Sequence, residues 1–202
     1  MKYTLKRARL HHALTFLVLA WCLSLSAQAD SNSFAARAVA TGDTRGQVFA
    51  IIDKASASLH LYNASGKLLA ASPVLLGQAK GDASVPGIGE RPMANIEPHE
   101  RTTPAGRFAS EPGKNLSGET VVWIDYDAAV SMHRLRPSNP QENRPERMAT
   151  PTPLDNRITY GCVNVPAEFY DRWVLPTLGK TVGVVYVLPE TQAVKDYFSF
   201  LR

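Results

Sequence analysis

One thiol and one imidazole are the side chains of this sequence best suited to covalent chemistry. Cys162 follows residues 158–161, where a branched residue and a threonine favour the end of a strand. Gly161 permits a turn there, and Pro166 stops any strand from continuing. A thiol displayed at such a turn could act as a nucleophile. The alternative is a small buried hydrophobic residue, which is what most free cysteines are.

A thiol nucleophile needs a base beside it and backbone N–H groups that stabilise the developing oxyanion. His133 is the best candidate base, because it ends the apolar stretch 128–133 and so lies at a strand end facing a loop. The N–H groups of Tyr160, Gly161 and Cys162 are the candidate donors. From the residues alone, a Cys–His acyl-transfer site and a structural cysteine stay open as alternatives.

Residues 1–29 have the organisation of a secretory signal peptide. Four basic residues precede the apolar run 13–25, and Ala27-Gln28-Ala29 is a small-x-small cleavage pattern. The apolar run is too short to span a membrane comfortably, although an uncleaved anchor is the alternative. We therefore expect an exported protein of the periplasm or cell envelope, with no transmembrane segment after the leader is cleaved.

Removing the leader changes what the composition implies. The net charge of +4 resides in the basic leader, so the remaining chain is balanced and gives no support to nucleic-acid binding. Of the two cysteines only Cys162 remains, so no internal disulfide can form, and a lone thiol in an oxidising compartment is either buried or used. No metal-ligand spacing or phosphate-binding loop occurs in the sequence.

Short apolar stretches separated by glycine and proline turns predict a mostly-β sandwich or barrel with one or two short helices. The organisation expected is a linker or loosely attached segment at 30–46, one domain at 47–190 and a tail at 191–202. The predicted strands cover 47–53, 58–62, 67–70, 73–77, 120–126, 128–133 and 181–188. Residues 102–108 are predicted to form a turn that leads into a further strand, and the predicted helix covers 166–175.

Several segments resemble the L,D-transpeptidase (YkuD-type) catalytic domain. The run Thr159-Tyr160-Gly161-Cys162-Val163-Asn164, preceded by a histidine at a strand end, is similar to that family's Ser/Thr-x-Gly-Cys signature. Thr103-Pro104-x-Gly106-x-Phe108 resembles its Thr-Pro-x-Gly-x-Phe segment, and residues 52–62 resemble its opening hairpin. The resemblance covers residues 48–188. Tyr160 replaces a histidine that many members carry, and the segment between His133 and Cys162 is longer than usual.

The resemblance implies an enzyme of peptidoglycan biosynthesis, and hence of cell-wall biogenesis and cell shape. Cys162 would attack a stem tetrapeptide, release its terminal D-Ala and pass the acyl group to an amine. His133 would be the base, and the N–H groups of Tyr160, Gly161 and Cys162 the oxyanion hole. Asn164 would orient the turn or touch substrate, or be a simple turn residue. No metal or diffusible cofactor is implied.

Two alternatives to transpeptidation remain. Water could resolve the same acyl-enzyme, which gives a carboxypeptidase or a stem-peptide or wall-protein hydrolase. A catalytically silent wall-binding domain is the other alternative.

The long proline- and arginine-rich segment 134–157 is a further candidate region. We hypothesise a lid or acceptor-recognition loop whose arginines, Arg134 and Arg157 among them, grip the carboxylates of stem peptides. A solvated insert that touches nothing is the alternative.

Overall fold

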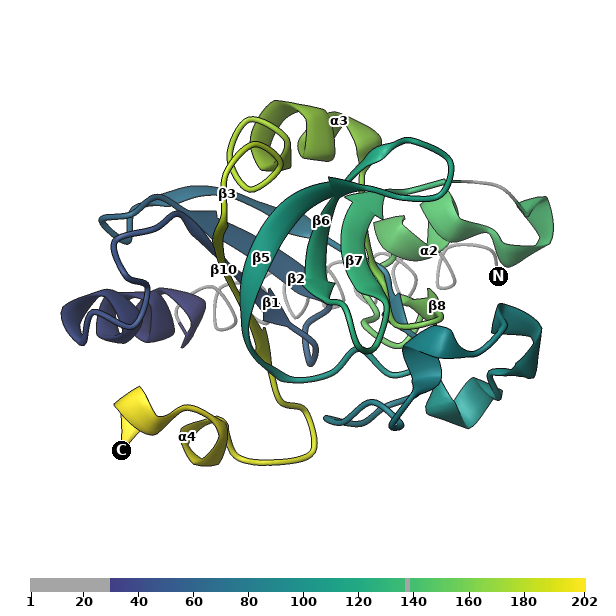
Figure 1. Cartoon of the computed structure of the whole chain (residues 1–202), viewed down its shortest axis with the longest axis horizontal. Helices are drawn as coiled ribbons and strands as arrows, with labels where there is room; N and C mark the ends of the chain where they lie inside the picture. Colours follow the sequence, from purple (N-terminus) through teal and green to yellow (C-terminus); the bar gives the residue numbers. More distant parts are fainter. Residues whose placement is uncertain (1–29, 137–138) are drawn as a thin grey trace, which may run out of the picture.

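The structure is a computed structural model that describes residues 30–136 and 139–202. Eight strands of the described chain form one mixed sheet in the order β3-β2-β1-β10-β5-β6-β7-β9 (Figure 1). Leu75, just beyond β3, forms an antiparallel bridge with Asn164 on β9, so the two edges meet and the sheet nearly closes into a barrel. The strands of the sheet are β1 (Phe49–Asp53), β2 (Ser58–Tyr62), β3 (Leu68–Pro73), β5 (Gly106–Lys114), β6 (Thr120–Asp125), β7 (Val130–Arg134), β9 (Val163–Val165) and β10 (Gly183–Leu188). The predicted mostly-β class is confirmed.

The strands β1, β6 and β10 form where the sequence is apolar and rich in β-branched residues. Every residue of β10 is buried, because this strand lies between β1, to which it runs parallel, and β5, to which it runs antiparallel. The turn at 63–66 joins β2 to β3 as predicted, with the Asn63 side chain accepting hydrogen bonds from the backbone N–H groups of Ser65 and Lys67. A separate parallel pair, β4 (Leu76–Gly77) and β8 (Arg157–Thr159), leads into the Cys162 turn.

The helices of the described chain are short, and they are more numerous than predicted. The helix expected at 166–175 exists as α3 (Ala167–Phe169), which continues as a π-helical turn at Tyr170–Val174. The segment expected to be an irregular loop at 134–157 contains a 3₁₀ turn at Pro140–Glu142 and α2 (Arg144–Ala149), with Pro145 in the first turn of α2, where a missing N–H costs nothing. Other 3₁₀ turns are Ile88–Glu90, Met93–Asn95, Pro98–Glu100 and Ser199–Leu201, and the tail also holds α4 (Val194–Tyr197).

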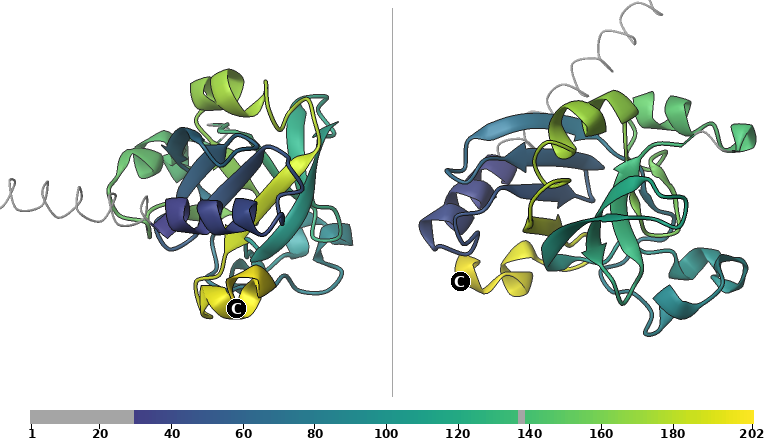
Figure 2. Two further views of the ribbon diagram at one scale, coloured as in Figure 1. Left: turned by 90° about the vertical axis from the view of Figure 1, so that its left-hand side faces the viewer. Right: turned by 45° about the horizontal axis from the view of Figure 1, so that its top comes forward.

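The expectation of a loosely attached segment at 30–46 is wrong. Residues 30–40 form a helix whose Phe34, Ala35 and Ala38 are buried. These side chains join a second hydrophobic cluster on the outer face of the sheet, which also contains Tyr186 of β10 and Phe198 of the tail. Figures 1 and 2 show this helix and the C-terminal segment near each other at one end of the molecule. Both ends of the described chain are thus part of the folded domain.

The predicted signal peptide, residues 1–29, lies outside the described residues, as do 137–138 of the 134–157 segment. Among the residues described, no helix has the length and apolar character needed to cross a membrane.

Candidate active site

Two neighbouring strands bring Cys162 and His133 together. β7 and β9 are parallel, with Met132 opposite Val163 and His133 opposite Asn164, so the residue just before β9 lies beside the last residues of β7. Gly161 has φ +131°, and a Cβ there would lie 2.8 Å from the carbonyl oxygen of Thr102. The turn that presents the thiol therefore requires glycine at this position.

The Cys162 thiol lies among groups that stabilise its ionised form. The Ser131 N–H donates to Sγ at 3.5 Å, and the Ser131 hydroxyl lies 3.8 Å from it. Burial opposes ionisation, but the hydrogen bond and charge of His133, with the contribution of Ser131, outweigh burial and lower the pKa of Cys162. The Ala129 carbonyl, 3.7 Å from Sγ, accepts from the protonated thiol.

The His133 ring is fixed on both nitrogens. Nδ1 lies 2.8 Å from the carbonyl oxygen of Arg134, and Nε2 lies 3.2 Å from Nδ2 of Asn164. Burial lowers the pKa of His133, whereas the Cys162 side chain raises it by more, so the net pKa lies above the ordinary value. A histidine held beside a thiol of lowered pKa has the arrangement of a base and its nucleophile.

The three candidate oxyanion donors differ in their availability. The Gly161 N–H donates to Oγ1 of Thr159 at 3.1 Å, and that hydroxyl donates to the carbonyl of Cys162 at 2.7 Å. Gly161 is therefore engaged within the turn. Among the described residues, nothing accepts a hydrogen bond from the N–H of Tyr160 or Cys162, which leaves these two groups free for a ligand.

The thiol opens into a cavity of about 620 Å³. Its described lining contains the basic side chains Lys114, Arg136 and Arg144, and no aspartate or glutamate. Apolar side chains, including Trp123 and the exposed Leu116, line another part of the cavity. The cavity thus suits a ligand that has both apolar groups and negative charge. The lining residues are Met93, Lys114, Asn115, Leu116, Ser117, Trp123, Ala129, Ser131, His133, Arg136, Arg144, Thr159, Tyr160, Cys162 and Asn164.

Two predicted substrate-binding residues lie elsewhere. Arg134 donates to Asp171 at 2.8 Å and stacks over the Tyr170 ring. Arg157 is 7% exposed and forms an ion pair with Glu190 at 2.5 Å. Neither lines the cavity, and each guanidinium is held by a carboxylate away from it.

Asn164 is a strand residue and not the simple turn residue that was one of the alternatives for it. It belongs to β9, and its backbone exchanges two hydrogen bonds with Leu75. Its side chain accepts from Arg144 Nη1 at 2.8 Å and contacts His133. Asn164 thus connects the candidate base to α2.

Ser131 was missed from the sequence, and the contact that Arg144 makes at the site was not foreseen. The signal for Ser131 was its position two residues before His133, which puts both on one face of the same strand. Arg144 was grouped with the other arginines of the 134–157 segment, and the sequence holds no sign of its separate contact with Asn164.

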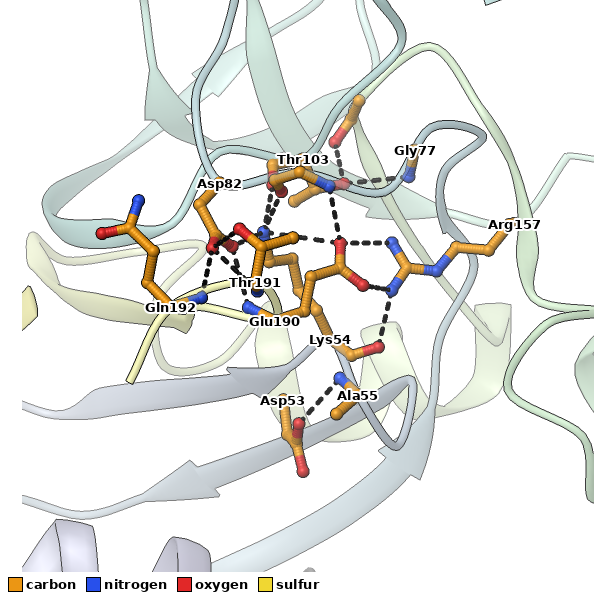
Figure 3. Close-up of polar contacts among 12 residues, drawn as sticks. Asp53, Lys54, Ala55, Gly77, Asp82, Thr103, Arg157, Glu190, Thr191 and Gln192 are labelled. Carbon is orange, nitrogen blue, oxygen red and sulfur yellow. Dashed lines mark hydrogen bonds and ion pairs between the residues drawn. The ribbon is translucent and has the colours of Figure 1, made fainter. Parts of the chain in front are cut away.

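A buried ion network lies behind the Cys162 turn (Figure 3). Lys54, fully buried, donates to Asp82 at 2.8 Å and to the Thr103 carbonyl at 3.0 Å, while Glu190 pairs with Arg157. Burial lowers the pKa of Lys54, and Asp82 opposes that shift. The two cations and two carboxylates of the network balance one another, as buried charges require.

Thr103 links this network to the nucleophile turn. Its hydroxyl donates to the Gly161 carbonyl at 2.8 Å and accepts from the Gly77 N–H at 2.9 Å. The Thr-Pro-x-Gly-x-Phe segment therefore supports the residue that precedes Cys162.

Within residues 30–136 and 139–202, no three His, Cys, Asp or Glu side chains are grouped so that they could hold a metal ion.

No protein-family model and no curated protein matches the chain. The solved structures to which it is similar are mainly of L,D-transpeptidases. The L,D-transpeptidase from Mycobacterium smegmatis is 18% identical, with a TM-score of 0.40 over 73% of this chain and 59% of that one. The enzyme from Xylanimonas cellulosilytica is 15% identical, with a TM-score of 0.40 over 70% of this chain and 60% of that one.

The helical cell shape determining protein Pgp2 from Campylobacter jejuni is 14% identical, with a TM-score of 0.45 over 72% of this chain and 48% of that one. The chain thus spans about half to three-fifths of the length of these three proteins. At these identities the likeness concerns the fold, so the chemistry rests on the residues of the site.

Proposed function

We propose that the protein is an exported peptidoglycan L,D-transpeptidase with Cys162 as nucleophile and His133 as base. The observation that carries this proposal is the placement of the thiol between His133 and the Ser131 N–H, where its pKa is lowered, at the wall of a cavity with basic lining. The sequence motifs around Cys162 and Thr103 resemble that family and add a substrate class, the peptidoglycan stem peptide.

Acylation follows from the positions of these groups. His133 takes the thiol proton on Nε2, and the Cys162 sulfur forms a bond to the carbonyl carbon that precedes the terminal D-Ala of a stem tetrapeptide. The oxyanion accepts hydrogen bonds from the N–H groups of Cys162 and Tyr160. The carbon–nitrogen bond then breaks, His133 returns the proton to the leaving amine, and free D-Ala departs.

Transfer reverses the proton movements. An acceptor amine attacks the thioester carbonyl and loses a proton to His133, the carbon–sulfur bond breaks, and the thiolate is regenerated. Lys114 of the cavity lining would bind a carboxylate that a stem peptide carries, whereas Arg136 is paired with Glu119. If water replaces the amine, the same acyl-enzyme yields a tripeptide acid.

Incubation of the purified protein with a stem tetrapeptide, with and without an amine acceptor, tests the proposal. We expect D-Ala release and a new amide product that forms only with the acceptor, and neither in Cys162→Ala. A tripeptide acid as the sole product would replace transpeptidation by hydrolysis. No D-Ala release from folded protein under either condition would overturn the proposal, and retained sacculus binding would then identify a binding domain.

A further inference from the structure

We propose that Arg144 is a positioning residue that determines which nitrogen of His133 carries the proton, and that it acts through the side-chain amide of Asn164. This inference deepens the proposed function, because it assigns how the base of that reaction is kept in its active form. It gives α2, which lies in the unusually long 134–157 segment, a role in positioning the proposed base His133.

The direction of the Asn164 amide follows from the chemistry of its two neighbours. A guanidinium donates hydrogen bonds and accepts none, so the Asn164 atom that lies 2.8 Å from Arg144 Nη1 is the amide oxygen. The amide nitrogen then points at His133 Nε2, 3.2 Å away. Because that nitrogen is a donor, Nε2 must present its lone pair.

The other side of the ring imposes the same tautomer. Nδ1 of His133 lies 2.8 Å from the carbonyl oxygen of Arg134, which can only accept, so Nδ1 carries the proton. A neutral imidazole has one N–H, and Nε2 is left unprotonated. Two separate contacts thus keep Nε2 unprotonated, with its lone pair accepting from the Asn164 amide. This hydrogen bond is exchanged for one from the thiol when Nε2 takes the thiol proton.

Arg144 and Asn164 are both well fixed. Asn164 is 1% exposed, and its backbone is bonded to Leu75 on both its N–H and its carbonyl, so little besides the side-chain torsions can move the amide. Arg144 lies in the first turn of α2, and its Nε donates to Glu142 at 2.5 Å. The guanidinium is therefore held between a carboxylate and the amide it orients.

Loss of Arg144 removes the preference for one amide orientation. The Asn164 oxygen can then turn towards His133 and accept from a protonated Nε2, which moves the lone pair to Nδ1, against the Arg134 carbonyl and away from the thiol. The charged groups at this side of the ring are Cys162 and Arg144, and Lys114 and Arg136 line the same cavity. The positive charge of Arg144 also disfavours the imidazolium, which assists return of the proton to the leaving amine.

Nitrogen-15 NMR of the histidine side chains tests the inference without any substrate, so its outcome is independent of the proposed function. The His133 signals are assigned by their absence from His133→Gln. At a pH above the raised pKa of His133, where the imidazole is neutral, we expect Nδ1 protonated and Nε2 unprotonated in the wild-type protein. In Arg144→Met the Arg134 carbonyl still favours Nδ1–H, so a mixture of the two tautomers is expected rather than a full reversal. Arg144→Lys, which keeps a charge and a donor, is expected to restore the wild-type pattern in part.

Arg147→Met is the matched control, because Arg147 lies on the same helix but donates to the carbonyls of Glu142 and Asp155 rather than to Asn164. A wild-type tautomer in Arg144→Met, or an equal shift in Arg147→Met, would overturn the inference. In turnover assays, Arg144→Met is expected to lower kcat about tenfold with KM changed less than about twofold. A raised KM with unchanged kcat would instead make Arg144 a substrate-binding residue.

Discussion

Replacing Thr103 by valine is expected to destabilise the protein, because it removes the hydroxyl that joins the nucleophile turn to the rest of the fold. Thr103 is fully buried, and its hydroxyl satisfies both the Gly161 carbonyl and the Gly77 N–H. Valine has nearly the same shape, so no cavity forms and the loss is one of hydrogen bonding. Each buried backbone group left without a partner costs about 1–3 kcal/mol, so for these two groups the free energy of unfolding should fall by about 2–6 kcal/mol.

Urea unfolding measures this loss against a matched control. With a urea dependence of about 2 kcal/mol per M, the unfolding midpoint of Thr103→Val should fall by about 1–3 M. Thr103→Ser keeps the hydroxyl and loses one methyl group, so it should cost about 1 kcal/mol. A midpoint for Thr103→Val within about 0.3 M of wild type would show that the two hydrogen bonds of the hydroxyl contribute little to stability. An equal loss of unfolding free energy in Thr103→Ser would show the same.

Three further predictions follow from the pKa shifts and the packing. Because His133 lowers the pKa of Cys162, His133→Ala should raise that pKa. Alkylation of the thiol by iodoacetamide at pH 7 should then be slower by about tenfold or more. An unchanged rate would show that the two side chains are not coupled. Burial opposes ionisation of Asp82, but hydrogen bonds from Lys54 and from residues beyond β10 outweigh it and hold the pKa well below the ordinary 3.8. The stability that this carboxylate contributes is therefore present above about pH 4 and is lost as the pH falls towards its folded pKa. Below about pH 4 the melting temperature of Asp82→Asn should therefore fall less steeply with pH than that of the wild type. Equal slopes for the two proteins would contradict the assignment. Phe34→Ala should lower the free energy of unfolding by about 3–5 kcal/mol, because the Phe34 ring packs edge-on against three aromatic rings. A loss below about 1 kcal/mol would show that the helix at 30–40 contributes little to stability.

The strands were predictable because their signal is local. β6 coincides with an apolar, β-branched run, and β2 with a run in which polar and apolar residues alternate. The turn residues that begin at Asn63 indicate the hairpin between β2 and β3. The helix at 30–40 was missed although alanine favours helix, because its buried face is narrow and consists mainly of small residues. Its partner surface on β10 and the tail lies more than 140 positions away, which a local pattern does not reveal.

Some residues of the candidate site could likewise be predicted from local sequence, and others could not. Gly161 and Cys162 could be singled out because the turn that presents a thiol has local requirements. The arginines of the 134–157 segment could not be separated, because an arginine's role depends on which acceptor lies near it in space. Arg157 is buried against Glu190 and Arg144 orients Asn164, yet the two look equivalent in the sequence.

Intact mass of the protein after incubation with a stem tetrapeptide or with imipenem tests the central claim most directly. We expect one acyl group per wild-type chain, released by hydroxylamine as a thioester is. We expect slow acylation of His133→Ala and no acylation of Cys162→Ala. Acylation of Cys162→Ala to the same extent, or no adduct with either acyl donor on folded wild-type protein, would contradict the assignment of Cys162 as the nucleophile.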